Sequence, residues 1–489
     1  MNSVAVHIIR SAFNRLVYKG GKLNGNNVYA RGYIVSNEKL ELPCGLSWSM
    51  SNVGGYFFYT HSKTAFNIWS SGAKSVVIIG LATDIDDVSL TTREITSKVS
   101  EIYENSGYSE AIEYVAYLGG RFLCFLIESG KSMQIIPDCH ATYACYYSQF
   151  ARPVFCSHIN LLAEVEGNEV NENARSIVNS KEYVSPGGKY YPALMLPFKQ
   201  TGLIFANSKL IHNFKGKEII SERFYPFSHS AFSISNVDAE KVNKFNRVLG
   251  KNLRAIVKNT VFHISLTGGN DSGVTLSALL REKLESQAKA FTYFNASRAS
   301  DMAEDVFEAS RRAYKAKISH KIVELKPLDI SSDFHKQYSS SFRLGARYPS
   351  LARAYYEDLP HDILSLVSTC SETGTAFYMD RSDVEISARC LAAKFTTSKI
   401  KNNPDVIKSF EEYIEHTMFT KEKLAGLDFY DVFYWEHRNA KWASLWYSEA
   451  DLSHFTVVPF NQRTLIELML SIPLEQRSNK EFLKRSMSS

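Results

Sequence analysis

Residues 260–280 read TVFHISLTGGNDSGVTLSALL and predict a strand, a glycine loop and a helix. The first seven positions are rich in β-branched and aromatic side chains, as a buried strand is. Two adjacent glycines follow, and Asp271 and Ser272 are residue types that start helices. Apolar residues at 274, 276, 279 and 280 then form a helical stripe. A glycine loop at a helix N-terminus predicts an anion site, because its N–H groups converge on the ligand and the helix dipole favours negative charge.

The loop differs from the two commonest nucleotide-binding loops. It lacks the Gly-Lys-Ser/Thr ending of the P-loop, and it lacks Gly-x-Gly-x-x-Gly. Its sequence, Thr-Gly-Gly-Asn-Asp-Ser at 267–272, resembles the Ser-Gly-Gly-x-Asp-Ser pyrophosphate loop of enzymes that cleave ATP to AMP and pyrophosphate. An ordinary glycine-rich turn is the alternative interpretation.

Size and composition exclude several classes of protein. A chain of 489 residues suits two to three domains. It has no apolar run of about twenty residues and its first 19 residues make a poor signal peptide, so we expect a cytoplasmic protein without a membrane span. A net charge of +5, from 56 basic and 51 acidic residues, argues against nucleic-acid binding. Seven cysteines without a Cys-x-x-Cys pair read as reduced thiols.

The first half of the chain is rich in short apolar runs separated by turn residues. We expect strands at 28–30, 33–35, 55–59 and 75–80, and helices at 93–105 and 109–115. Two strands around the turn at 128–131 make a hairpin over 118–138, and strands at 142–147 and 154–156 follow. This pattern predicts a layered antiparallel sheet.

A second resemblance lies in this half. Its pattern is a hydrophobic hairpin, an Asp, an aromatic strand, Phe-x-Ser and a Leu-Leu helix. It resembles the glutaminase domain of asparagine synthetases, a class II glutamine amidotransferase domain with an Ntn-hydrolase-like fold. The residues that carry the likeness are Leu118, Gly120, Phe122, Asp138, Tyr143, Tyr146, Phe155, Ser157, Leu161 and Leu162. The resemblance implies a glutaminase-like domain at 1–222 and an ATP-binding synthetase domain at 223–489. An unrelated β domain is the alternative.

One departure from this family bears on the reaction. Active members expose a cysteine as the first mature residue, and glutamine acylates its thiolate. Here Asn2 stands in that place and the first cysteine is Cys44. We therefore expect no glutamine hydrolysis. β-Lactam synthetases and lasso-peptide cyclases of the same broad family also carry a disabled domain.

The second half alternates strands and helices. After a helix over 237–257 come the loop strand, strands at 288–295, 321–325 and 363–368, and a helix at 301–316. This order predicts a doubly wound parallel α/β sheet, with ligands at the carboxyl ends of the strands. Helices at 402–418 and 430–446 make the C-terminal part helical. The whole fold is expected to be multidomain, with this ATP-pyrophosphatase (PP-loop) domain following the antiparallel one.

The family resemblance implies roles for particular residues. Glu372 matches a glutamate that works with a tyrosine to deprotonate an amine, and Tyr348 is the first candidate partner, with Tyr355 and Tyr356 as alternatives. Phe294 and the Leu266 backbone would frame adenine, and Asp271 would hold Mg²⁺. The residues expected to bind ATP are Leu266, Thr267, Gly268, Gly269, Asn270, Asp271, Ser272, Phe294 and Ser371.

Two further departures leave alternatives open. Thr375 and Ala376 stand where the family has acidic residues, for which Asp380 could substitute. The family also has a catalytic lysine in a segment beyond the end of this sequence. Lys480 or Lys484 could do its work, or a partner chain could supply it.

The expected function is an ATP-dependent, amide-forming ligase that uses ATP and Mg²⁺. It would adenylate a carboxylate of a small-molecule or peptide substrate and couple it to an amine, without glutamine hydrolysis. Alternatives are an ammonia-using or glutamine-dependent asparagine synthetase, RNA thiolation or tRNA editing, and a nucleotide-binding partner subunit with little or no catalysis. A homodimer or a partner subunit is possible, and neither a membrane nor a nucleic acid is expected as a partner.

Overall fold

The computed structural model describes residues 27–488, except 44, 149, 151, 186, 187, 217, 229 and 231, and it omits the side chains of 299–301. Asn2 and Cys44 lie outside the described residues. The other six cysteines are buried and free, as expected for reduced thiols. Among the described residues, no helix combines the length and the apolar character that crossing a bilayer would require.

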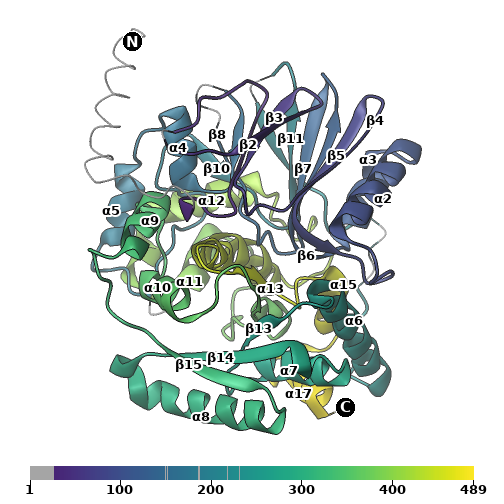
Figure 1. The fold of residues 1–489 in the computed structure, drawn as a ribbon, viewed down its shortest axis with the longest axis vertical. Helices are drawn as coiled ribbons and strands as arrows, with labels where there is room; N and C mark the ends of the chain where they lie inside the picture. Colours follow the sequence, from purple (N-terminus) through teal and green to yellow (C-terminus); the bar gives the residue numbers. More distant parts are fainter. Residues whose placement is uncertain are drawn as a thin grey trace.

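Two six-stranded antiparallel sheets make up the first half and lie at the top of Figure 1. The first has the order β10 (Thr201–Leu203), β8 (Tyr146–Ser148), β9 (Val154–Cys156), β1 (Tyr33–Ser36), β3 (Tyr56–Thr60), β2 (Ser49–Val53). The second has the order β12 (Ile219–Arg223), β11 (Ser208–Asn213), β7 (Ser132–Pro137), β6 (Gly119–Glu128), β5 (Lys74–Thr83), β4 (Phe66–Ser71).

The two sheets pack face to face. Buried side chains such as Val35, Phe125 and Phe155 fill the space between them. On the outer face of the second sheet, Val76 and Ile78 pack against the amphipathic helices α2 (Thr92–Asn105) and α3 (Tyr108–Ala116). Helices α4 (Ile159–Glu166) and α5 (Glu172–Asn179) complete this half. Because both faces of its sheet are covered, β6 is buried along almost its whole length.

A parallel five-stranded sheet forms the other pole of the molecule (Figure 1). Its order is β15 (Ser319–Glu324), β14 (Ala288–Phe294), β13 (Phe262–Ser265), β16 (Leu364–Leu366), β17 (Phe455–Val457). The strands accompany helices α6 (Ala239–Val257), α7 (Asn270–Arg281), α8 (Ala299–Lys315) and α10 (Pro349–Asp358). The chain runs outward from β13 to β15 and then returns to the other side of β13. This reversal opens a crevice at the carboxyl ends of β13 and β16.

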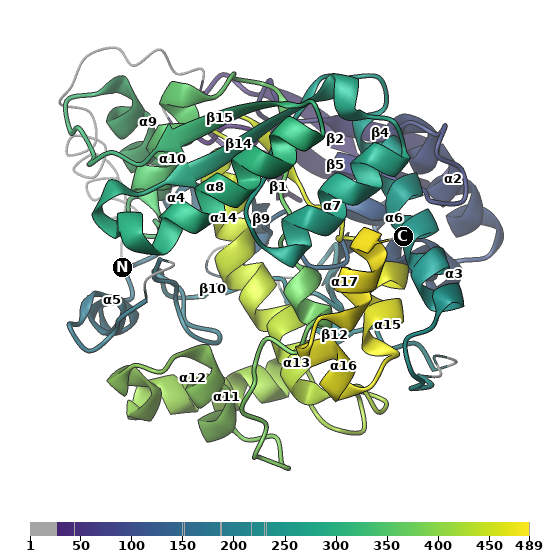
Figure 2. The ribbon, with the colours of Figure 1, turned by 90° about the horizontal axis from the view of Figure 1, so that it is seen from below.

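The remaining helices fill the region between the sheets and flank the parallel sheet (Figures 1 and 2). Short 3₁₀ turns are η2 (Glu285–Gln287), η3 (Ala296–Arg298), η4 (Ser371–Gly374) and η5 (Lys399–Asn402), and η6 (Tyr434–Ala443) is a π-helix. The other helices are α9 (Asp333–Phe342), α11 (Ala388–Phe395), α12 (Pro404–His416), α13 (Phe429–Phe433), α14 (Ser444–Ala450), α15 (Arg463–Leu470), α16 (Leu474–Ser478) and α17 (Glu481–Ser488).

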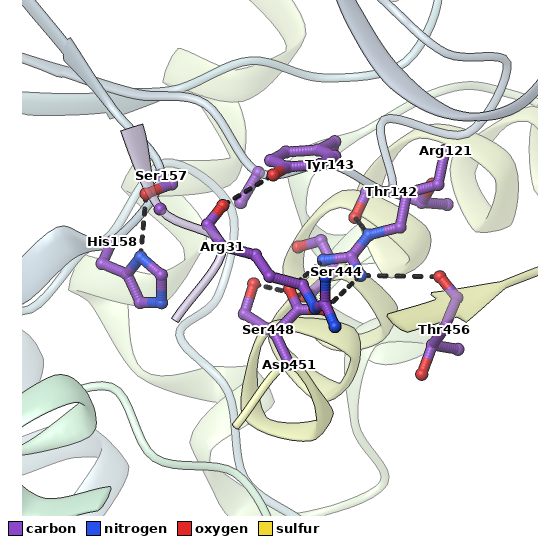
Figure 3. Close-up of polar contacts among 12 residues, drawn as sticks. Arg31, Arg121, Thr142, Tyr143, Ser157, His158, Ser444, Ser448, Asp451 and Thr456 are labelled. Carbon is purple, nitrogen blue, oxygen red and sulfur yellow. Dashed lines mark hydrogen bonds and ion pairs between the residues drawn. The ribbon is translucent and has the colours of Figure 1, made fainter. Parts of the chain in front are cut away.

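The two halves share buried contacts. One hydrophobic core joins residues of the first half to the C-terminal helices, as in the ring contact between Phe205 and Tyr413 at 5.1 Å. A buried ion pair joins β6 to the residue after α14, because Arg121 donates to both oxygens of Asp451 at 2.8 and 2.7 Å. Figure 3 shows the Arg121 side chain reaching Asp451, with further bonds to the carbonyls of Thr142 and Thr456.

The structure agrees with the predicted fold class in its coarse features, since antiparallel layered sheets precede a parallel α/β sheet. Some elements differ. Residues 28–30 lie in a turn, and the strand predicted at 142–147 is limited to β8. Strands β2 and β4 were not predicted, because both are largely exposed and lack an apolar run. The helix predicted at 430–446 is interrupted by the π-helix η6.

Candidate functional site

A cavity of about 440 Å³ lies at the crevice between β13 and β16. Residues that follow the carboxyl ends of β13, β14 and β16 line it, as expected where the strand order of a doubly wound sheet reverses. Its lining residues are Ser265, Thr267, Asp271, Ser272, Tyr293, Asn295, Arg298, Met302, Asp305, Arg347, Tyr348, Leu351, Val367, Ser368, Thr369, Glu372, Trp442 and Trp446.

The glycine loop is the floor of one end of this cavity. The N–H of Thr267 donates to Ser272 Oγ at 3.1 Å, and the N–H of Gly269 donates to Thr267 Oγ1 at 3.1 Å, so the loop is closed on itself. Gly269 is the N-cap of α7, and no side chain caps this helix end. An uncapped N-terminus leaves first-turn N–H groups available to an anion. Leu266 is fully buried below the loop.

Helix α8 supplies two side chains that hold the loop. The Arg312 guanidinium donates to the carbonyls of Thr267, Gly268 and Gly269, at 3.3, 2.8 and 2.8 Å. The Asp305 carboxylate accepts the N–H of Gly268 at 3.0 Å. Asp305 therefore occupies one of the donors that a pyrophosphate would use. Sequence analysis missed both residues, because polar residues on an amphipathic helix resemble a solvated surface.

Asp271 is the meeting point of three segments. It lies in the first turn of α7, its Oδ1 accepts the Ser371 hydroxyl at 2.6 Å, and its Oδ2 lies 3.6 Å from Lys480 Nζ. The structure thus brings together Asp271, Ser371 and Lys480, which sequence analysis had selected from three distant parts of the chain. Lys484 lies one turn further along α17, where its N–H donates to the Lys480 carbonyl.

Glu372 is partly buried beside Asp271 and forms a pair with a tyrosine. The Tyr434 hydroxyl donates to Glu372 Oε2 at 3.0 Å. Burial, and then the charge of Asp271, raise the pKa of Glu372. Burial and the Glu372 charge raise the pKa of Tyr434. Tyr434 is the first residue of the π-helix, a distortion that is frequent at functional sites.

The tyrosine that hydrogen-bonds Glu372 in the structure is not one of the three predicted candidates. Tyr348 lines the cavity at the start of α10, but Tyr434 holds the glutamate. Tyr355 is buried against Phe291, and Tyr356 packs against Phe334 outside the cavity lining. The only sequence signal for Tyr434 was its place in an aromatic-rich helix, which core packing explains equally well.

Two other expected residues lie elsewhere. Phe294 is not among the cavity-lining residues described, whereas the preceding Tyr293 is. Successive side chains of a strand point to opposite faces of the sheet, so Phe294 and Tyr293 lie on opposite faces of β14, and Tyr293 is on the face toward the cavity. Asp380 is exposed and pairs with Lys394 at 3.0 Å, so it does not replace the missing acidic residue. Asn270 and Gly268 belong to the loop without lining the cavity themselves.

The residues present fit a bound Mg²⁺. No group of three or more His, Cys, Asp or Glu side chains that could hold a metal occurs in the described part of the chain. Magnesium usually takes only one or two protein carboxylates and completes its shell with water and phosphate. Asp271 provides one such carboxylate at the wall of the cavity, in the first turn of the helix that follows the glycine loop.

The far end of the cavity is aromatic and cationic. Trp442 and Trp446 project from the π-helix and α14, and the buried Arg347 guanidinium lies over their rings at 4.3 and 5.1 Å from the centroids. Such stacking holds a guanidinium in a fixed plane. This end is therefore suited to a substrate with a flat or apolar body.

Comparisons with known proteins add little. No family model matches the chain, and no curated protein matches it. Among solved structures, one described as the allosteric regulatory enzyme of purine biosynthesis is 9% identical, with 80% of this chain and 75% of that chain covered, at a TM-score of 0.24. A likeness of this size supports no statement on fold or function, so the site rests on its own geometry.

Proposed function

We propose that this protein is an ATP-dependent ligase that forms amides through an acyl-adenylate, as the sequence resemblance to asparagine synthetases implies. The observation that carries the proposal is the environment of Asp271. The pyrophosphate-type loop, Glu372 with its partner Tyr434, and Lys480 surround this carboxylate. Thr267, Ser272 and Glu372 line the same cavity as Asp271. In this proposal residues 1–222 form a glutaminase-like domain without its nucleophile, and 223–489 form the synthetase domain.

The first step would join a substrate carboxylate to ATP. A carboxylate oxygen attacks the α-phosphorus, the bond to the bridging oxygen breaks, and the acyl-adenylate and pyrophosphate result. The N–H groups at the start of α7 and the ammonium of Lys480 face the negative charge that develops on pyrophosphate. Mg²⁺ held by Asp271 would neutralise phosphate charge.

The second step would form the amide. An amine nitrogen attacks the acyl carbon, AMP leaves with the electron pair of the broken C–O bond, and the nitrogen loses a proton. Glu372 is the proposed acceptor of that proton, and Tyr434 orients its carboxylate at 3.0 Å. We favour an amine on the substrate itself or on a second substrate, as in the cyclases and ligases of the family that the sequence resembles.

The test uses the full chain with Mg-ATP, a mixture of the twenty amino acids as carboxylates, and hydroxylamine as the amine. We expect AMP and pyrophosphate in equal amounts. Asp271→Ala should lower AMP release at least 100-fold, whereas the exposed control Asp333→Ala should not change it. Cleavage to ADP and phosphate, or an Asp271→Ala variant as active as wild type, would refute the assignment.

A second candidate function is a nucleotide-binding subunit without catalysis. One observation favours it: the Asp305 carboxylate already occupies the N–H of Gly268 and repels a phosphate there. A fluorescent ATP analogue that binds while pyrophosphate never appears in the assay above identifies this case. Equal binding by Asp271→Ala and wild type would argue against both candidates.

A further inference from the structure

The turn that follows β7 in the first half of the chain reaches the Glu372 site. It contains Asp138, Cys139 and His140, and all three are buried. Asp138 fixes the turn, because its two oxygens accept the N–H groups of Phe122, His140, Thr142 and Tyr143 and the Thr142 hydroxyl. A turn with this many bonds to one carboxylate has little freedom to move.

Asn461, which follows β17, locks the same turn to the second half. Its amide nitrogen donates to the carbonyl of Gly120 and to Asp138 Oδ1, at 2.5 and 2.9 Å. Its amide oxygen accepts from both the N–H and Nδ1 of His140, at 3.0 and 2.8 Å. Since the amide nitrogen faces acceptors only, the orientation of the amide is determined.

This arrangement determines the state of the His140 ring. Burial lowers the pKa of His140 to about 3, so the ring is neutral. Nδ1 faces an acceptor, and it must therefore carry the hydrogen. Nε2 is then an acceptor, and it lies 3.3 Å from the Thr373 hydroxyl, which donates to it. Thr373 is fully buried and is the residue after Glu372.

The same turn makes a second contact beside the site. The carbonyl of Cys139 accepts the indole Nε1–H of Trp435 at 2.7 Å. Trp435 is the residue after Tyr434, the hydrogen-bond partner of Glu372. Cys139 and His140 are thus adjacent in the turn and make two parallel contacts. Cys139 holds Trp435, which follows Tyr434, and His140 holds Thr373, which follows Glu372.

We propose that the Asp138–Thr142 turn positions the catalytic pair, with His140 and Thr373 as positioning residues. The first half of the chain then contributes to amide formation by holding Glu372 and Tyr434 in register. The proposal rests on the proposed function for its catalytic consequence, but not for the contacts themselves. An error of about 1 Å in placing a reacting group can lower a rate about 100-fold.

The test compares Thr373→Val, which removes the hydroxyl at constant shape, with Thr373→Ser, which keeps it. His140→Phe removes both ring nitrogens. We expect Thr373→Val and His140→Phe to lower kcat for AMP release about 10- to 100-fold in the assay above, with KM for ATP within twofold of wild type. Thr373→Ser should keep kcat within about threefold of wild type. A purely structural contact would lower stability without this division between kcat and KM.

His158→Phe is the matched control. Like His140, this histidine belongs to the first half, is buried, and has a pKa lowered by burial to about 3. It bonds Ser157 away from the site (Figure 3). His158→Phe should therefore leave KM and kcat unchanged at temperatures below its melting point.

Hydrogen–deuterium exchange tests the positioning role of the turn without depending on the proposed ligase activity. Hydrogen–deuterium exchange of peptides covering 368–377 should become at least tenfold faster in Thr373→Val and His140→Phe, and stay at the wild-type rate in Thr373→Ser and His158→Phe. If wild type releases no AMP, the proposed function fails and the exchange rates alone decide about the turn. Wild-type exchange in Thr373→Val and His140→Phe, or equal impairment in Thr373→Ser and Thr373→Val, would overturn the proposal.

Discussion

The ion pair between Arg121 and Asp451 offers a sharp test of how the two halves are joined. Their side chains are only 1% and 4% exposed, and two short bonds connect them in a side-on geometry. The perturbation is Arg121→Met, which removes the charge and keeps an apolar stem of similar length. It leaves the Asp451 carboxylate buried without its counter-ion.

The magnitude follows from this burial. Breaking a buried pair from one side costs about 3–5 kcal/mol of unfolding free energy, and we expect this loss for both Arg121→Met and Asp451→Leu. Replacing both partners removes the uncompensated charge, so the double variant should lie within about 2 kcal/mol of wild type. The double-mutant cycle then gives a coupling of roughly 4 kcal/mol or more, far above the few tenths expected of independent sites.

The assay is urea denaturation followed by tryptophan fluorescence and by circular dichroism. Coincidence of the two transitions is required, because a protein of this size can unfold in stages. Arg175→Met is the control, since the Arg175–Glu172 pair is exposed and should contribute less than about 1 kcal/mol. A loss below about 1 kcal/mol in Arg121→Met, or additive losses in the double variant, would refute the reasoning.

Three other changes test the site and its surroundings. Asp305→Ala removes a carboxylate that competes for the N–H of Gly268, and we expect about tenfold tighter binding of Mg-pyrophosphate by calorimetry. Tyr434→Phe removes the bond to Glu372 and should lower AMP release about 10- to 100-fold in the amino-acid assay. Burial lowers the pKa of Lys441 to about 7, so between pH 7 and about 10 the unfolded chain binds a proton that the folded one does not. The stability of wild type relative to Lys441→Met should therefore rise by about 2 kcal/mol from pH 7 to pH 9, measured by urea denaturation.

The following controls and outcomes test the predictions for Asp305, Tyr434 and Lys441. Asp333→Ala changes an exposed carboxylate of α9, and pyrophosphate affinity should not respond to it. Tyr348→Phe changes the tyrosine that sequence analysis preferred, and it should retain activity. If Tyr348→Phe is as damaging as Tyr434→Phe, the observed pair is not the working one. A stability difference between wild type and Lys441→Met that stays constant from pH 7 to pH 9 would contradict the lowered pKa of Lys441.

Local sequence was sufficient for the parts of the site that depend on neighbouring residues. The loop at 267–272 could be recognised because its strand, glycines and helix are consecutive. The alternation of strands and helices also predicted the parallel sheet. Lys480 was found through the resemblance, and the structure places it 3.6 Å from Asp271.

The missed residues depend on contacts that local patterns do not encode. Tyr434 lies 62 residues after Glu372, and a π-helix sets its direction. The usual helical period cannot predict which side of such a helix a residue faces. Asp305 and Arg312 approach the loop only after α8 packs against the sheet. Phe294 was predicted at the adenine site, but its neighbour Tyr293 lines the cavity, because the sequence alone does not show which face of β14 is turned toward the cavity.

The Arg121–Asp451 pair also has a consequence for synthesis on the ribosome. The two residues are 330 positions apart, so the arginine is made long before its counter-ion. At about 5–20 residues per second, the interval is roughly 15 to 70 s. During that time Arg121 has no counter-ion, so its guanidinium must remain exposed to water in the nascent first half. This interface therefore cannot close until Asp451 has been made, however early the sheets of the first half have formed.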